Sequence, residues 1–267
     1  MKYLRFIILL GSLWCFVPAQ GQKLKQQFPL NETLKFKISY GWFSLGEALV
    51  SIKDSLHFDK SEAYYRTTVD AGTIGLFSWL AGIEDHYEGL VHTETYRASY
   101  NEKQVRHRKE NFDQWNSFDY ENMKVYAKTK DYLKKRDKSK VVDLTENTYD
   151  ILGTYLFLRS RNWSGYRVGD SILIKTFYED KLYDFGMEYG GEETIKFEGR
   201  RVKTSKFYIL FPVSKTFPKE KAVTVWVTQR NQMTIPLQIE ADMKIGKVWC
   251  ELESYSVNGV DNSGLFD

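Results

Sequence analysis

The sequence predicts a mainly β protein, in which a long antiparallel meander forms a curved sheet or an open barrel with one amphipathic helix packed on it. Apolar and polar residues alternate with a period of two along many segments, which is typical of half-buried strands. Short connectors separate these segments, as in hairpins joined in chain order. One segment changes to the spacing of a helix. We therefore expect strands that follow one another in sequence and a helix that covers them.

The N-terminus has the features of an export signal. A basic stretch precedes 12 apolar residues (6–17), and small residues follow at 18–21. The apolar run is too short for a membrane-spanning helix, which needs about 20 residues. We expect cleavage after Ala19 or Gly21, a single β-rich domain over 20–267, and a periplasmic or secreted protein without a transmembrane segment.

Removal of the signal changes the charge and cysteine arithmetic. Cleavage removes Lys2 and Arg5 from the 38 Lys and Arg, so the basic residues nearly balance the 35 Asp and Glu. A net charge this close to zero argues against a nucleic-acid partner. Of the two cysteines only Cys250 remains, so no internal disulfide is expected. Cys250 lies in an alternating segment, where a packed small hydrophobic residue is favoured over a nucleophile.

The first strand pair is expected at 34–40 and 48–52, where the alternation is regular. Gly41 and Gly46 bracket the aromatic-rich segment 42–45 between these strands. Glycine inside such a pattern marks a bend or a close backbone approach. We therefore expect a bent hairpin.

The same alternation predicts further strands along the chain. They are expected around 65–69, 87–91, 96–100, 103–112, 119–128, 171–178, 181–189, 194–197, 202–210, 223–228, 237–243 and 247–257. The connectors are expected at 58–61, 179–180, 190–191 and 245–246.

The helix is predicted over 148–161, where apolar residues recur at helical spacing. Thr145 or Thr148 is expected to cap its N-terminus, and Gly165 marks a stop.

No catalytic or metal-binding signature stands out. The best metal-like set is His86, Glu88 and His92, which share one face of a strand. On a straight strand the first and last of these lie about 20 Å apart, so we expect ordinary polar positions and no metal. Carboxylates are paired at 84–85, at 192–193 and at 251 and 253, but sequence neighbours on a strand point to opposite faces, and no motif singles out one pair. We expect no cofactor and favour a protein that is not an enzyme.

A basic region spans 97–140, with 13 Lys and Arg against 7 Asp and Glu. A solvated, lysine-rich sheet edge that prevents aggregation is the favoured interpretation. Lipid headgroups, an anionic glycan or a protein edge are the alternative polyanions for an exported protein.

The order of several motifs resembles a family of exported bacterial proteins, the DUF3108 family, over about 28–257. The motifs are Tyr-Gly-Trp-Phe-Ser-Leu-Gly-Glu-Ala at 40–48, the Asp-led segment 149–159 that ends in Leu-Arg, Val-Gly-Asp at 168–170, Val-Trp-Val-Thr at 225–228, Ile-Pro-Leu at 235–237 and Ile-Gly at 245–246. The resemblance implies a barrel-like or strongly curved antiparallel sheet with helical cover, exported in Gram-negative bacteria. The acidic residue that the family usually has after the Trp strand is replaced here by Gln-Arg-Asn at 229–231.

These observations favour an exported, non-catalytic cell-envelope protein that binds an apolar or amphiphilic ligand or an envelope partner. The alternative is a hydrolase that acts on envelope glycan or lipid through a carboxylate pair. The candidate binding residues come from two aromatic-rich, glycine-bounded segments: Trp42, Phe43, Phe77, Trp79 and Leu80. They are expected to line one apolar surface, either a cavity mouth or a docking lip. The competing interpretation is that they plug one end of the barrel and complete its core.

Overall fold

The computed structural model describes residues 28–58, 62–75, 78, 82–214, 217–230, 233–244, 246–262 and 264. The predicted signal peptide, 1–19, lies outside the described residues. The described strands form one 16-stranded sheet, ordered β8-β7-β6-β5-β4-β3-β2-β1-β15-β14-β13-β12-β11-β10-β9, with β16 paired to β15.

The elements are β1 (Glu32–Tyr40), β2 (Phe43–Phe58), β3 (Glu62–Thr73), β4 (Glu84–His92), β5 (Ala98–Arg106), β6 (Asn111–Asp119), β7 (Lys124–Asp131), β8 (Arg136–Asp143), β9 (Thr148–Asp150), α2 (Ile151–Arg159), β10 (Ser171–Tyr178), β11 (Lys181–Phe197), β12 (Arg200–Leu210), β13 (Val223–Arg230), β14 (Met233–Met243), β15 (Gly246–Val257) and β16 (Val260–Asp261).

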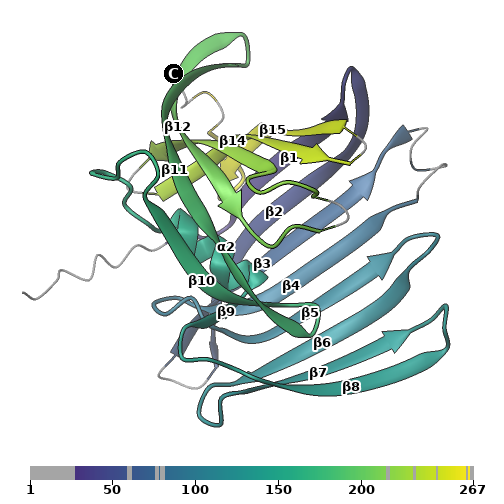
Figure 1. Ribbon diagram of the computed structural model, residues 1–267. Coiled ribbons are helices and arrows are strands. Elements are labelled where there is room, and N and C mark those ends of the chain that lie inside the picture. Colours follow the sequence, from purple (N-terminus) through teal and green to yellow (C-terminus); the bar gives the residue numbers. More distant parts are fainter. Residues whose placement is uncertain are drawn as a thin grey trace, which may run out of the picture.

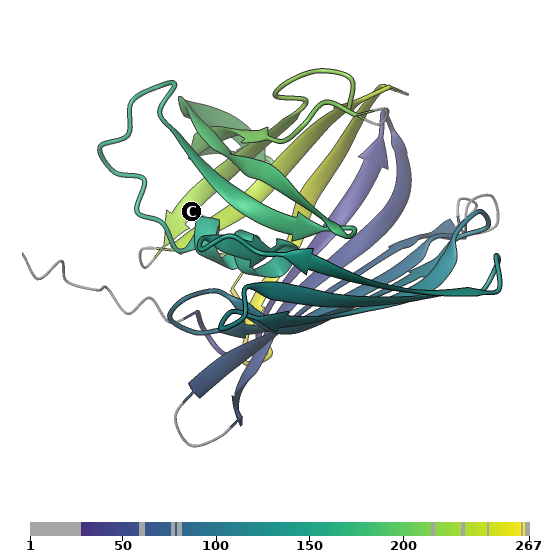
Figure 2. The ribbon, with the colours of Figure 1, turned by 60° about the horizontal axis from the view of Figure 1, so that its bottom comes forward.

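The sheet has two arms that meet at the pairing of β1 with β15. One arm runs from β1 to β8 in chain order, and the other runs back from β15 to β9. The arms curve toward each other, and α2 lies between them (Figures 1 and 2). The prediction of a mainly β fold, built as a curved antiparallel meander with a helix packed on it, is confirmed. Only the short pairing of β9 with β10 is parallel among the described ladders.

The apolar face of α2 packs on the inner face of the β1–β8 arm. Leu152 and Leu156 join Ile52, Tyr65 and Val91 in one buried cluster. Full burial of a side chain such as Leu156 stabilises the fold by about 1.5–3 kcal/mol. Because successive strand residues point to opposite faces, the residues that alternate with these core positions lie on the other face of the arm.

The helix begins later than the sequence predicts. Asp150 is its N-cap, and the Asp150 carboxylate accepts a hydrogen bond from the Gly153 amide at 2.6 Å. The predicted caps Thr145 and Thr148 are wrong, because Thr148 pairs with Lys175 as part of β9. The helix ends at Arg159, two residues before the predicted end at 161, and the amide of its C-cap Ser160 donates to the carbonyls of Leu156 and Leu158.

Several strand boundaries also differ from the prediction. The expected strand 103–112 is broken by the turn between β5 and β6, and the expected strand 119–128 by the turn between β6 and β7. The prediction ran through both turns because apolar and polar residues continue to alternate there. The expected connector 190–191 is a bulge inside β11. Strand β8 was not predicted, because it is an edge strand whose residues are nearly all polar and exposed.

Candidate functional site

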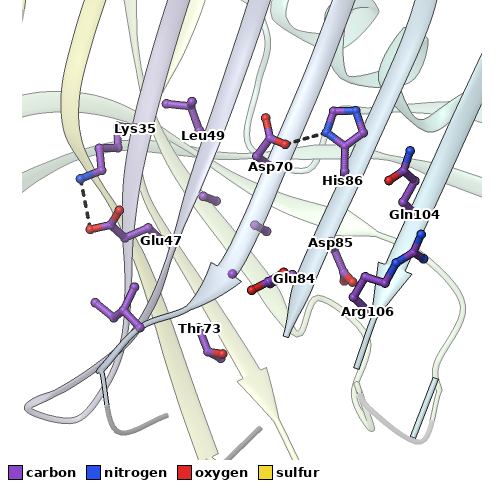
Figure 3. Close-up of a pocket in the computed structure, with 14 residues that line it drawn as sticks. Lys35, Glu47, Leu49, Asp70, Thr73, Glu84, Asp85, His86, Gln104 and Arg106 are labelled. Atoms are coloured by element: carbon purple, nitrogen blue, oxygen red, sulfur yellow. Dashed lines mark hydrogen bonds and ion pairs between the residues drawn. The ribbon is translucent and has the colours of Figure 1, made fainter. Parts of the chain in front are cut away.

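A groove of about 510 Å³ lies on the face of the β1–β8 arm that α2 does not cover. The strand register sets Leu49 beside Asp70, Asp70 beside His86, and His86 beside Gln104. These four positions form one row across β2 to β5 (Figure 3). They alternate with core positions such as Val50, which fixes the face to which they belong.

The groove is lined by charged side chains, several of them ion-paired, together with apolar residues such as Leu49 and Ile74. Asp70 Oδ1 lies 2.6 Å from His86 Nδ1. Lys35 Nζ contacts Glu47 at 3.1 Å and Glu253 at 2.8 Å, and these hydrogen bonds raise the pKa of Lys35. The groove thus offers charged and hydrogen-bonding groups to a ligand.

The second row of the groove adds more charge. Glu84 and Arg106 lie opposite each other on β4 and β5 (Figure 3), and Asp85, the next residue on β4, pairs with Val105. Arg106 donates to Asp113 at 2.5 Å, and Asp85 lies 2.7 Å from His107. Each of these contacts satisfies a charge within the protein.

Several turns of the β1–β8 arm lie at one edge of the molecule, at the right of Figures 1 and 2. The Ile74 amide donates to Leu45 at 3.0 Å, so β3 ends beside the start of β2. The Tyr132 amide donates to Asn111 at 2.8 Å, so the β7–β8 turn lies beside the β5–β6 turn. We call the turns 40–43, 107–110 and 132–135 the loop rim.

The predicted binding residues Trp42 and Phe43 lie on this loop rim. Trp42 is 93% exposed and Phe43 is 57% exposed, and their rings meet edge to face at 6.4 Å. Trp42 therefore does not complete the core as a barrel plug. The remaining candidates, Phe77, Trp79 and Leu80, lie outside the described residues.

The structure adds a second apolar pair, Tyr132 and Leu133, at the β7–β8 turn. They are 40% and 51% exposed, and exposed Lys134 and Lys135 follow them. The sequence placed this segment in the basic region 97–140, where Tyr132 is one of several interleaved aromatic residues, and did not single out the pair. The signal was present as an aromatic-aliphatic pair placed directly before two lysines.

The metal-like residues do not converge. Strand β4 runs without reversal from Glu84 to His92, so His86 lies beside Asp70 and His92 lies beside Tyr64. Across the ranges that the structure describes, no three His, Cys, Asp or Glu side chains are arranged to hold a metal ion.

A buried polar cluster joins the two arms. Lys103 Nζ donates to Glu179 at 2.9 Å and to Tyr178 at 3.2 Å. Asp180 accepts from Gln114 at 2.8 Å and from Lys138 at 2.6 Å. The void beside this cluster measures only about 20 Å³, so it has no room for an organic ligand.

Comparison with known proteins identifies the family. The model of a family described as "Protein of unknown function (DUF3108)" matches residues 35–253. The chain belongs to the DUF3108 family. A search of curated proteins finds no match.

This DUF3108 member is similar in fold to a solved structure, a β-barrel-like protein of domain of unknown function DUF1849 from Brucella abortus. The TM-score is 0.56 at 8% identity, over 87% of this chain and 99% of that chain. At this identity the likeness concerns the fold alone. In the described part of the chain, no helix has the length and apolarity needed to cross a bilayer.

Proposed function

We propose that this DUF3108 protein is an exported, non-catalytic cell-envelope protein that binds an amphiphilic ligand or an envelope partner at its loop rim. The observation that carries the proposal is the exposure of Trp42, with Phe43 beside it, at the tip of a hairpin. Large apolar side chains grouped in solvent are unfavourable unless a partner covers them.

Binding at the loop rim is favoured over an enclosed apolar ligand. The groove beside the rim is lined by charged residues, and the space between the arms near Lys103 is filled. Apolar ligands are usually held in concave, mostly apolar pockets. An open edge with exposed aromatic residues suits a partner that presents its own surface.

A sedimentation assay tests this proposal. Purified mature protein is mixed with native envelope fragments from a Gram-negative host, and the bound fraction is measured. We expect the variant Trp42→Ser/Phe43→Ser to lose most of its binding, whereas Leu173→Ser retains it. Leu173 is 62% exposed on β10, outside the loop rim, and is therefore a matched control. Equal binding by all three proteins contradicts the proposal.

One observation favours a second candidate, hydrolysis of envelope glycan or lipid. His86 and Asp70 are in contact within the groove, and an imidazole oriented by a carboxylate is a common general-base arrangement. Glu84 adds another carboxylate to the same groove.

The two candidates are separated by assaying purified protein on peptidoglycan and on phospholipid. The binding proposal expects no turnover. Turnover that is lost in Asp70→Asn and in His86→Ala, while both variants melt like the parent, overturns it in favour of hydrolysis.

A further inference from the structure

We propose that the loop rim docks on the anionic surface of a lipid bilayer. The inference rests on the proposed function and names the partner of that same site. Trp42 and Phe43 enter the interface, and the basic residues of the neighbouring turns contact lipid phosphates.

The β1–β2 turn has the composition of an interfacial anchor. Trp42 extends almost wholly into solvent from a turn in which Gly41 takes a positive φ of 57°. Indole and phenyl rings favour the boundary between lipid headgroups and acyl chains. A short hairpin tip places both rings there without inserting the rest of the sheet.

The β7–β8 turn repeats this pattern independently. Leu133 is exposed at its tip beside half-exposed Tyr132, whose hydroxyl donates to Asp113 at 2.6 Å, and Lys134, Lys135 and Arg136 follow directly. Six strand spacings separate this turn from the β1–β2 turn, which corresponds to roughly 30 Å across the sheet. A small amphiphile does not span that distance, whereas a bilayer surface does.

The charge of the rim matches an anionic surface. The β5–β6 turn, which lies between the two apolar tips, exposes Arg108 and Lys109 against Glu110. Lys134 contacts Asp131 at 3.1 Å but remains 69% exposed. The cations therefore flank the apolar tips, as in proteins that combine interfacial insertion with attraction to acidic lipids.

Vesicle sedimentation tests the inference with defined lipids. The probes are vesicles of phosphatidylethanolamine with phosphatidylglycerol, and vesicles of phosphatidylcholine alone. We expect the mature protein to bind the first and not the second, with binding that weakens as salt is raised. Trp42→Ser/Phe43→Ser and Lys134→Glu/Lys135→Glu are each expected to weaken binding by about tenfold or more.

The charge control is Lys196→Glu/Lys203→Glu, which changes the net charge equally. These residues flank the β11–β12 turn, and the register from β15 through β12 puts this turn at the opposite end of the strands from the rim. We expect this variant to bind like the parent. Equal losses in the control and rim variants overturn the inference, because they indicate non-specific charge attraction.

Quenching by brominated acyl chains gives a second readout. Trp42→Phe keeps an aromatic anchor, so we expect it to bind vesicles but to lose most of the tryptophan quenching seen in the parent. Unchanged quenching in this variant shows that Trp42 does not enter the bilayer and overturns the inference.

The outcomes separate the two proposals. Rim-dependent binding to native envelope without binding to pure anionic vesicles identifies a protein or glycan partner; it overturns the bilayer inference and leaves the proposed function standing. Absence of binding to both overturns both proposals.

Discussion

The guanidinium of Arg159 and the carboxylate of Glu32 form a two-pronged buried ion pair, with N–O distances of 2.6 and 3.0 Å. Arg159 Nε also donates to the Thr234 carbonyl at 2.8 Å, so the last turn of α2 is fixed to both β1 and β14. Burial is the largest single influence and lowers the pKa of Arg159, but the Glu32 charge, the Tyr155 hydroxyl and the hydrogen bond to Glu32 together raise the pKa above its usual range. Arg159 therefore stays protonated inside the protein.

Removal of one partner is expected to destabilise the fold strongly. Glu32→Gln leaves a buried, unpaired guanidinium, which costs about 3–5 kcal/mol of unfolding free energy. Urea melts of the variant measure this loss. The double variant Glu32→Leu/Arg159→Met removes both charges and should recover much of it. A Glu32→Gln variant as stable as the parent contradicts the assignment.

Gly46→Val is expected to destabilise the fold through a backbone clash and not through the loss of an active site. A Cβ at position 46 falls 2.2 Å from the carbonyl oxygen of Gly72, which is backbone and has little room to move. We expect a loss of about 1–3 kcal/mol or more. Gly246→Val is expected to act similarly, because its φ of +116° disfavours a side chain. Gly264 has open space around its Cβ position, so Gly264→Val is a control that should melt unchanged.

Asp150 predicts a specific dependence of stability on pH. Burial raises the pKa of this carboxyl above 3.8, although hydrogen bonds from Asn101 and Gly153 oppose the rise. The folded state therefore holds the proton more tightly than the unfolded state, and the resulting stabilisation is lost as pH rises from 3.8 through the folded pKa. Paired urea melts of the parent and Asp150→Asn should show the parent relatively more stable at the acid end of this window. A difference that does not change with pH contradicts this prediction.

Cys250 should be unreactive in the folded protein. Burial raises the pKa of its thiol to about 12, so little thiolate forms at neutral pH. We expect iodoacetamide to label Cys250 only after unfolding in urea, as measured by mass spectrometry. Rapid labelling of the native protein refutes the packed position.

Export is expected to remove the N-terminus. N-terminal sequencing of protein recovered from the periplasm should begin at Gln20 or Gln22. An intact Met1 or a fatty-acylated Cys15 contradicts this expectation.

The parts of the fold that could be predicted are those encoded within one short segment of the sequence. Period-two alternation identified most strands, because one face of each strand is buried on the shared core. The same signal failed at β8, an edge strand that buries almost nothing, and at 107–110, where alternation continues through a turn. The start of α2 was misplaced because Thr148 pairs with Lys175, a contact that no local pattern contains.

The candidate site was predictable only in part, for a related reason. Trp42 and Phe43 were found because glycines isolate an aromatic segment of the sequence. Their position on the same edge as Tyr132 and Leu133 depends on the register of every strand from β2 to β7. No single segment of the sequence encodes that juxtaposition.

The seam between β1 and β15 has a consequence for the order of folding. Among the described ladders, every other one joins strands that follow each other along the chain, and the longest segment between two such strands is the 20 residues (151–170) that include α2, between β9 and β10. At the seam, Asn31 Nδ2 donates to Oδ1 of Asn258, which lies 227 positions later in the chain. The β1–β15 ladder closes the longest loop among the described ladders, so its formation has the largest entropic cost. It requires both β1 and β15 to be available. If the chain is exported N-terminus first, as proposed, the β1–β15 ladder forms only after β15 has left the translocation pore, so the sheet is completed only when transport is nearly finished.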